Sequence, residues 1–212
     1  MDAVRVALLR EVLAGTEWLG ATRRFAGALR GSVVSHGGGL LLVGTPEYEP
    51  WHLAAHLVDE AAWSGTPELA PTLVRHDAHP SDPAHLAVGL GRLAAARRGE
   101  TLLVVSPCGS PRSSGFESGG GPAAPLLERV HDARRAGATV LALGPGEGDL
   151  TSMAHESLPV PDGSELDLDT VQHLVSAAAG ENAVPVARGS RRVRDRLSRL
   201  AELLTAPPPS AW

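Results

Sequence analysis

The sequence lacks residue types whose chemistry would define several protein classes. It contains no lysine, so all 19 basic residues are arginines, and it has a single cysteine, Cys108. One cysteine excludes an intrachain disulfide framework and a cysteine-rich zinc module. The absence of lysine excludes a Schiff-base mechanism and the lysine of a P-loop. No GxGxxG motif follows a predicted strand, which disfavours a dinucleotide site of that kind.

Strong positive charge and long apolar runs are also missing. The net charge is −5, which argues against nucleic-acid binding because phosphate neutralisation needs a basic surface. No apolar run reaches the roughly 18–20 residues of a membrane span, and the first 15 residues do not have the pattern of a secretory signal. We therefore expect a cytoplasmic protein with no nucleic-acid or membrane partner.

Hydrophobic periodicity predicts an α/β fold. Short apolar runs ending near glycine or proline indicate strands covered on both faces, and apolar residues at three-to-four spacing between them indicate helices. Their alternation predicts a three-layer α/β/α sandwich with a central parallel sheet, an N-terminal helix and a C-terminal helical extension. The predicted strands are 40–44, 72–74, 101–105, 139–143 and 158–161, and the predicted helices are 2–30, 49–62, 83–96, 125–136, 149–155, 166–179 and 191–204.

The chain is long enough to bury its own core and shows no internal repeat or obvious linker. Its 212 residues and 43% hydrophobic content predict a single domain over residues 1–205. Residues 111–124 are rich in glycine, serine and proline and predict a flexible loop. Residues 206–212 follow the last predicted helix and predict a disordered tail.

The loops after the predicted strands are candidates for ligand binding, because ligands of parallel α/β sheets bind at the carboxyl ends of the strands. The loop after strand 101–105 supplies hydroxyls and close backbone approach, both of which suit a phosphate group. A serine-rich loop without a ligand is the alternative interpretation, and Cys108 is more simply a small residue lining a turn than a nucleophile. The candidate residues of this loop are Ser106, Cys108, Gly109, Ser110 and Ser113.

Two histidines stand four residues apart in the predicted helix 49–62. His52 and His56 therefore share one helix face, which suits two metal ligands or an acid and a base. One histidine in a helix interface and one in solvent is the simpler alternative. Asp169 and His173 form a second pair with the same spacing, but the sequence does not show that the two helices meet.

Two carboxylates follow the first predicted strand. Glu47 is a candidate for proton transfer at carbon if it is partly desolvated. Glu49 is more simply an acid that meets the dipole at the start of a helix.

These segments resemble the sugar isomerase (SIS) family, especially the phosphoheptose isomerase group. LLLVG–TPEYEP–WHLAAHL is similar to that group's first strand, loop and helix, VVSPCGS to its phosphate loop, and DTVQHLV to a late helix bearing Gln and His. The resemblance covers roughly residues 2–180. It implies a five-stranded parallel sheet, a homodimer or homotetramer, and a phosphosugar at the strand ends. Ser106, Cys108, Gly109 and Ser110 would hold phosphate, Thr45, Pro46 and Glu47 would line the sugar, and His52, His56, Gln172 and His173 would face the site.

The sequence departs from the phosphoheptose isomerase pattern at three places, one of which is a long insertion rich in glycine, serine and proline in the second loop. His56 stands where the group has the catalytic glutamate of its His-x-x-x-Glu pair, and Gly44-Thr45-Pro46-Glu47 replaces a Gly-Asn-Gly-Gly-Ser turn. These departures argue against heptose isomerisation and against the zinc that some members bind through this helix pair. We therefore expect no metal and no cofactor.

Two functions of different classes are compatible with these residues. SIS enzymes remove a proton next to a sugar carbonyl, and the resulting intermediate leads to isomerisation or to elimination at the β carbon. Elimination or isomerisation of an amino-sugar 6-phosphate, such as N-acetylglucosamine 6-phosphate, is the first hypothesis, with Glu47 as base and His52, His56 or His173 as acid. A non-catalytic phosphosugar sensor is the alternative, since SIS domains also serve in regulators, and a phosphoheptose isomerase is a further alternative within the enzyme class.

Overall fold

The computed structural model describes residues 9, 11–107, 124–161, 163–164 and 166–181. A five-stranded sheet forms its centre, with the strand order β2-β1-β3-β4-β5 and every neighbouring pair parallel. The strands are β1 (Leu40–Val43), β2 (Pro71–Val74), β3 (Thr101–Val105), β4 (Thr139–Gly144) and β5 (Glu156–Pro159).

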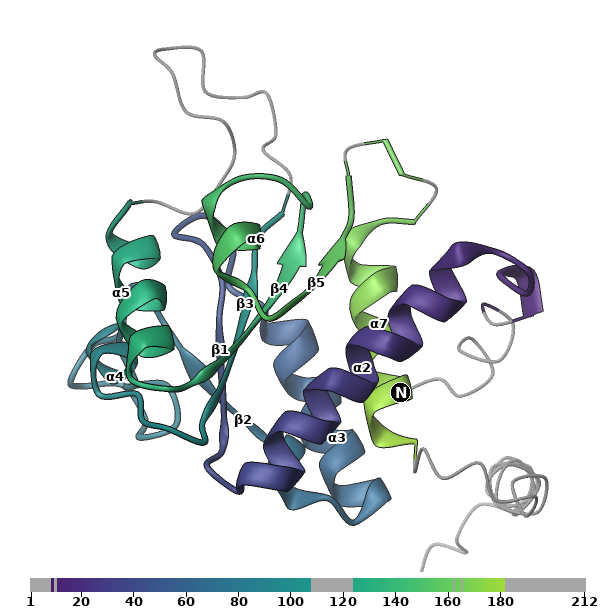
Figure 1. The fold of residues 1–212 in the computed structure, drawn as a ribbon. Helices are drawn as coiled ribbons and strands as arrows, with labels where there is room; N and C mark the ends of the chain where they lie inside the picture. Colours follow the sequence, from purple (N-terminus) through teal and green to yellow (C-terminus); the bar gives the residue numbers. More distant parts are fainter. Residues whose placement is uncertain (1–8, 10, 108–123, 162, 165, 182–212) are drawn as a thin grey trace, which may run out of the picture.

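Helices cover both faces of this sheet (Figure 1). One layer contains α2 (Glu17–His36), α3 (Trp51–Ser64) and α7 (Leu168–Gly180), and the other contains α4 (Gly91–Ala94), α5 (Ala124–Arg135) and α6 (Asp149–Met153). A short 3-10 helix, Pro67–Leu69, follows α3. The predicted three-layer α/β/α fold with a central parallel sheet is therefore confirmed.

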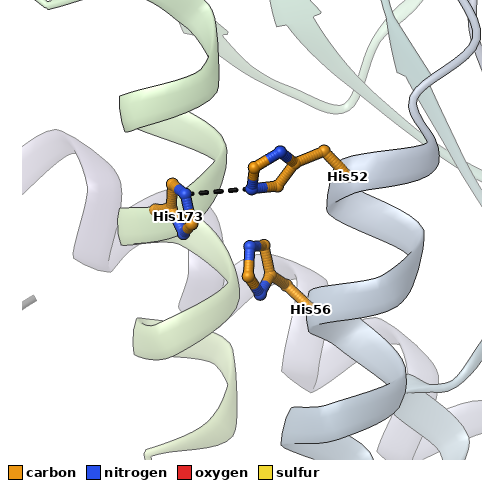
Figure 2. A group of neighbouring side chains, drawn as sticks. All are labelled: His52, His56 and His173. Carbon is orange, nitrogen blue, oxygen red and sulfur yellow. Dashed lines mark hydrogen bonds between the residues drawn. The ribbon is translucent and has the colours of Figure 1, made fainter. Parts of the chain in front are cut away.

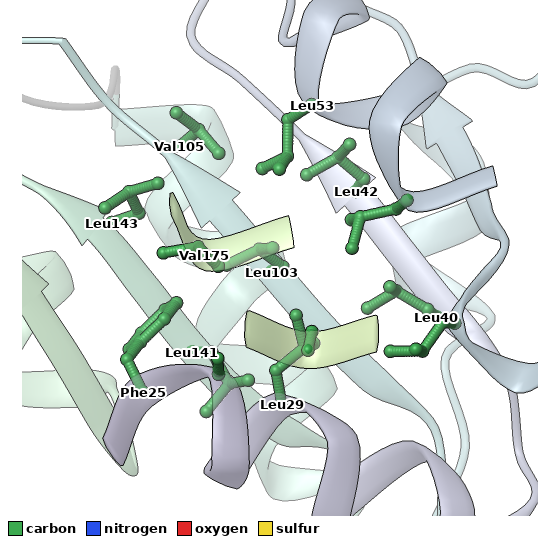
Figure 3. Packing of buried hydrophobic residues seen from close by; sticks show 14 of the residues in the cluster. Phe25, Leu29, Leu40, Leu42, Leu53, Leu103, Val105, Leu141, Leu143 and Val175 are labelled. Atoms are coloured by element: carbon green, nitrogen blue, oxygen red, sulfur yellow. The ribbon is translucent and has the colours of Figure 1, made fainter. Parts of the chain in front are cut away.

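Strand residues divide the core into two halves because successive side chains of a strand point to opposite faces. Leu40 and Leu42 pack with α2, α3 and α7 (Figure 3), whereas Leu41 and Val43 pack with α4, α5 and α6. All four residues of β1 are buried. Burial of both faces explains why this strand is an uninterrupted apolar run in the sequence.

Two predicted helices differ from the structure. The helix expected over 2–30 is interrupted, because residues 11–12 are helical, residues 13–15 form a turn with Gly15 at φ +88°, and α2 starts at Glu17 and runs to His36. The helix expected over 83–96 is reduced to α4, Gly91–Ala94. Residues 84–86 form a turn instead, and Gly89 forms an isolated parallel β-bridge with Arg75, so the chain is not helical again until Gly91.

Other predictions fall outside the described residues. The loop 111–124 lies there except for its last residue, which begins α5. The C-terminal helical extension and the tail 206–212 also lie outside. Within the described ranges, no helix combines the length and apolarity that crossing a bilayer requires.

The strand order places a topological switch point between β1 and β3. From β1 the chain crosses to β2 on one side, and it then returns to β3 on the other side. Connections that leave in opposite directions open a crevice at the carboxyl ends of these two strands, where open α/β sheets bind ligands. The residues that follow β1 and β3 therefore border the expected site.

Candidate functional site

Two buried hydroxyl residues border the switch point. Thr45 follows β1 and Ser106 follows β3, and both side chains are buried. The Ser106 hydroxyl has no hydrogen-bond partner among the described atoms, and a buried polar group without a partner is uncommon. Of the predicted phosphate loop, Cys108, Gly109, Ser110 and Ser113 lie outside the described residues.

Three histidines from two helices meet beside this edge of the sheet (Figure 2). His52 lies in the first turn of α3, His56 one turn later, and His173 in the second turn of α7. His52 Nε2 and His173 Nε2 are 2.9 Å apart. One nitrogen atom from each ring lies within 4.8 Å of the other two. The structure therefore brings the predicted histidines together across a gap of more than 100 residues in sequence.

The three imidazole rings lie against one another. Their centroids are 4.2–4.5 Å apart. Both ring nitrogens of His56 are buried and have no hydrogen-bond partner among the residues that the structure describes. Burial, followed by the neighbouring His173 and His52 rings, lowers the pKa of His56 from 6.5 to about 4. His56 is consequently a neutral imidazole with an uncommitted lone pair near neutral pH.

A second polar cluster lies one helical turn away, where Tyr48 meets α7. The Gln172 amide donates from Nε2 to the Tyr48 hydroxyl at 2.7 Å, and that hydroxyl lies 3.4 Å from Asp169 Oδ1. Burial raises the pKa of Tyr48, and the Asp169 carboxylate adds to this shift. The predicted pair Asp169 and His173 therefore does not act on one site in common. Asp169 contacts Tyr48, whereas His173 contacts the other histidines. Sequence reasoning missed Tyr48, although it is the only tyrosine and stands in a strand-end loop.

The turn that carries Glu47 is tightly built. Tyr48 N donates to Thr45 O at 3.1 Å, and a Cβ on Gly44 would come within 1.8 Å of the Tyr48 carbonyl oxygen. Only glycine therefore fits at position 44 without a shift of the backbone. Glu47 itself is exposed between Thr45 and Tyr48. Glu47 thus lies at an exposed position on the segment that links β1 to the histidine helix.

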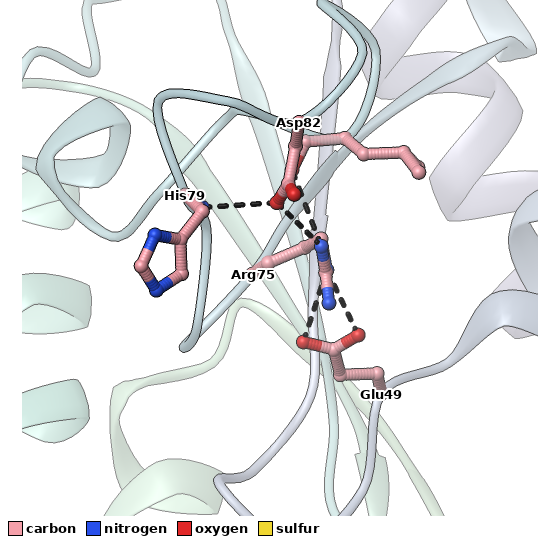
Figure 4. A network of polar contacts seen from close by, with 5 residues as sticks. Glu49, Arg75, His79 and Asp82 are labelled. Atoms are coloured by element: carbon pink, nitrogen blue, oxygen red, sulfur yellow. Dashed lines mark hydrogen bonds and ion pairs between the residues drawn. The ribbon is translucent and has the colours of Figure 1, made fainter.

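An arginine on β2's carboxyl side holds the start of α3 (Figure 4). Arg75 Nε donates to both Glu49 oxygens at 3.1 and 3.3 Å, and Arg75 Nη1 donates to Asp82 at 3.2 Å. The guanidinium also stacks over the Trp51 ring, 5.2 Å from its centroid. Glu49, expected only to meet the helix dipole, is thus part of an ion pair. This network was not predicted, because the sequence does not show which carboxylates Arg75 reaches.

No model of a known protein family matches the chain, and no curated protein sequence matches it. Solved structures match through their architecture. The sugar isomerase domain of the RpiR transcription factor from Sphaerobacter thermophilus superposes with a TM-score of 0.50 and 16% identity, covering 95% of this chain and 97% of that one. A candidate phosphosugar isomerase from Silicibacter pomeroyi DSS-3 superposes with a TM-score of 0.50 and 17% identity. The alignment covers 93% of this chain and 52% of that one, so the present chain spans about half of its length.

Proposed function

Because the chain has the fold of a sugar isomerase (SIS) domain, we propose that it is a phosphosugar enzyme. The reaction is removal of a proton next to the sugar carbonyl, followed by elimination or isomerisation of an amino-sugar 6-phosphate. The observation that carries this proposal is the convergence of His52 and His56, on the helix that follows β1, with His173 of α7. Three adjacent imidazoles supply proton donors and acceptors at a place where the fold binds ligands.

The proposal assigns separate roles to the acid–base residues and to the phosphate-binding residues. Glu47 takes the proton from C2, and a histidine of the cluster gives a proton to the departing oxygen or to the ring oxygen. His56 is suited to act as an acceptor because its low pKa keeps it neutral, whereas His52 is exposed and reaches solvent. Thr45 and Ser106 line the crevice, and Cys108, Gly109, Ser110 and Ser113 are the proposed remainder of the phosphate site.

An amino-sugar substrate favours elimination over isomerisation. A 2-acetamido sugar carries nitrogen at C2, so C2 cannot become a new carbonyl by simple proton shuttling. Removal of the C2 proton instead allows the C3 hydroxyl to leave as water once it is protonated. The base must therefore reach the C2 proton while the acid reaches the oxygen on C3, and the proposal gives these tasks to Glu47 and to a histidine of the cluster.

As an alternative to proton transfer by these rings, the histidine cluster offers three ligands for a divalent metal ion. Two nitrogens on one tetrahedral zinc ion, each about 2 Å from it, lie about 3.3 Å apart. The observed separations of 2.9 Å and up to 4.8 Å bracket this value. The two unpartnered nitrogens of His56 are a further mark of fit. His52, His56 and His173 would hold the ion, which would polarise a substrate oxygen when bound.

A panel of sugar phosphates tests the proposed enzyme. Glucosamine 6-phosphate, N-acetylglucosamine 6-phosphate, fructose 6-phosphate and sedoheptulose 7-phosphate are added separately, and thermal stability and proton NMR spectra are recorded on the same samples. Stabilisation together with a new vinylic signal or an exchanged C2 proton supports an enzyme, and the product distinguishes elimination from isomerisation. Absence of stabilisation by every sugar phosphate refutes the phosphosugar proposal.

Replacement of Glu47 tests the assignment of the base. The Glu47→Gln variant should lose at least about 100-fold in turnover, which is the usual contribution of a general base, and should keep the thermal midpoint of the wild type. Glu156→Gln is the matched control, because Glu156 is equally exposed but lies at the amino end of β5. Activity of Glu47→Gln equal to that of the control would remove Glu47 from the mechanism.

A phosphosugar sensor is the second candidate. It is favoured by the superposition on nearly the whole sugar isomerase domain of a transcription factor, and by the exposed position of Glu47 in the free protein. A sensor would be stabilised by its sugar phosphate by mass action and would leave the NMR spectrum of that sugar unchanged.

A further inference from the structure

We propose that the hydroxyl of Tyr48 is a specificity-determining donor that hydrogen-bonds one oxygen of the bound sugar. This inference rests on the proposed phosphosugar site and extends it by one residue. It starts from the contact between the β1–α3 loop and α7, where Tyr48 meets Gln172 and Asp169.

The Tyr48 hydroxyl accepts a short hydrogen bond but donates only a long one. The Gln172 amide occupies one lone pair of the hydroxyl at 2.7 Å. The acceptor for the phenol proton, Asp169 Oδ1, is 3.4 Å away, well beyond the 2.7–2.8 Å at which O–H···O bonds are commonest. A ligand oxygen at normal distance would therefore be a better acceptor than Asp169.

The group that holds the phenol is itself fixed. Gln172 is completely buried, and its Nε2 also lies 3.3 Å from the Leu168 carbonyl oxygen and 3.3 Å from Asp169 Oδ1. These acceptors orient the amide, so the hydroxyl is positioned before any ligand arrives. Such preorganisation reduces the cost of ordering on binding. Burial, which raises the pKa of Tyr48, keeps the phenol protonated and able to donate.

The Tyr48 hydroxyl contacts α7 about one helical turn before the residue that joins the histidine cluster. Asp169 and His173 are four residues apart on α7, about 6 Å along the helix. Tyr48 contacts the first of them and His52 contacts the second. A hexose ring with its hydroxyls covers such a span, so one sugar can contact the phenol and the imidazoles together. The ligand class is therefore a polyhydroxylated sugar phosphate with an acceptor oxygen facing the α3–α7 contact.

Binding of N-acetylglucosamine 6-phosphate and of analogues that lack one oxygen at C1, C3 or C4 tests this inference. Affinities are measured by calorimetry for the wild type, for Tyr48→Phe and for the control Thr72→Val, which removes an exposed hydroxyl from the edge strand β2. We expect Tyr48→Phe to weaken binding of the parent sugar about tenfold, as loss of one neutral hydrogen bond does. For one analogue, the affinities of wild type and Tyr48→Phe should be equal. Equal affinity of the two proteins for every compound, the parent included, overturns the inference.

The single tyrosine allows a test without any substitution. Protein labelled with ¹³C at tyrosine Cζ gives one resonance, which reports on hydrogen bonding by the phenol. This resonance should shift with N-acetylglucosamine 6-phosphate and not with the analogue identified above. A binding sugar that leaves the resonance unmoved overturns the role of Tyr48 while the phosphosugar site stands. If the wild type binds none of the four sugar phosphates of the panel, the proposed function fails and this inference fails with it.

Discussion

Individual residues of the candidate site have properties that depend on their immediate neighbours. His56 lies against two other imidazoles, and within the described part of the chain its two buried nitrogens make no hydrogen bond. A proton on His56 would therefore be poorly solvated and would repel any charge on His52 or His173. The same two features make the ring a good neutral ligand or proton acceptor.

The low pKa of His56 predicts a pH-dependent stability in metal-free protein. The pKa is about 4 in the folded state and 6.5 ordinarily. Between these values the unfolded chain takes up a proton that the folded protein does not, so the free energy of unfolding should fall as the pH drops from 6.5 to 4. Above pH 6.5 this contribution is absent. Urea titrations at several pH values measure it.

Two histidine variants isolate this contribution. His56→Gln should flatten the pH dependence of the unfolding free energy between pH 6.5 and 4. His131→Gln should retain the wild-type slope, because His131 is an exposed residue of α5 in the opposite layer. If the slope of His56→Gln equals that of His131→Gln, the histidine cluster does not tune His56.

The helices that carry the histidines are each fixed by an arginine, one near the carboxyl end of the sheet and one at the opposite end of the helices. At the carboxyl end of the sheet, Arg75 ties β2 to Glu49 at the start of α3. At the other end of the helices, Arg30 of α2 donates to the Ala179 carbonyl oxygen of α7 at 2.8 Å and to the Thr66 hydroxyl beyond α3 at 2.7 Å. The α3–α7 contact that carries the histidines lies between these two attachments.

Loss of Arg75 should loosen the start of α3. Arg75→Ala leaves the half-buried Glu49 and Asp82 without their guanidinium and should lower the unfolding free energy by about 1–2 kcal/mol. It should also broaden the ¹H–¹⁵N signals of the His52 ring, because His52 follows Trp51 directly. Arg23→Ala, on the exposed side of α2, is the control. A variant with unchanged stability and an unchanged His52 signal would show that Arg75 does not position this helix.

At the scale of the whole molecule, the histidine cluster lies in one helical layer, between α3 and α7. These two helices share a hydrophobic core with α2. A ligand that binds only the folded protein therefore stabilises the entire domain by mass action. The histidines come from helices that meet only in the folded chain, so the unfolded chain does not present the same donor set.

Zinc should accordingly raise the thermal midpoint of the protein. At a free concentration 100 times the dissociation constant, stabilisation is about 2.7 kcal/mol, which corresponds to about 5–10 °C for a chain of this length. Differential scanning calorimetry with and without a chelator measures this shift. His173→Gln should abolish it and His131→Gln should retain it. An equal shift in both variants would mean that zinc binds elsewhere.

The sequence by itself determined the layers, the sheet and part of the site. Apolar runs such as Leu40–Val43 predicted strands covered on both faces, and the spacing of His52 and His56 placed them on one helix face, because these signals depend on local periodicity. The sequence prediction was wrong over 83–96, where a turn and the bridge between Gly89 and Arg75 precede α4 and only Gly91–Ala94 are helical.

Only the tertiary structure decided which partners meet. His52 and His173 are 121 residues apart and join because α3 and α7 pack on the same face of the sheet. Tyr48 and Gln172 are 124 residues apart, and Arg75 finds Glu49 because β1 and β2 are neighbours. Such contacts depend on how the helices and strands pack around a shared core, which periodicity within any one segment does not encode.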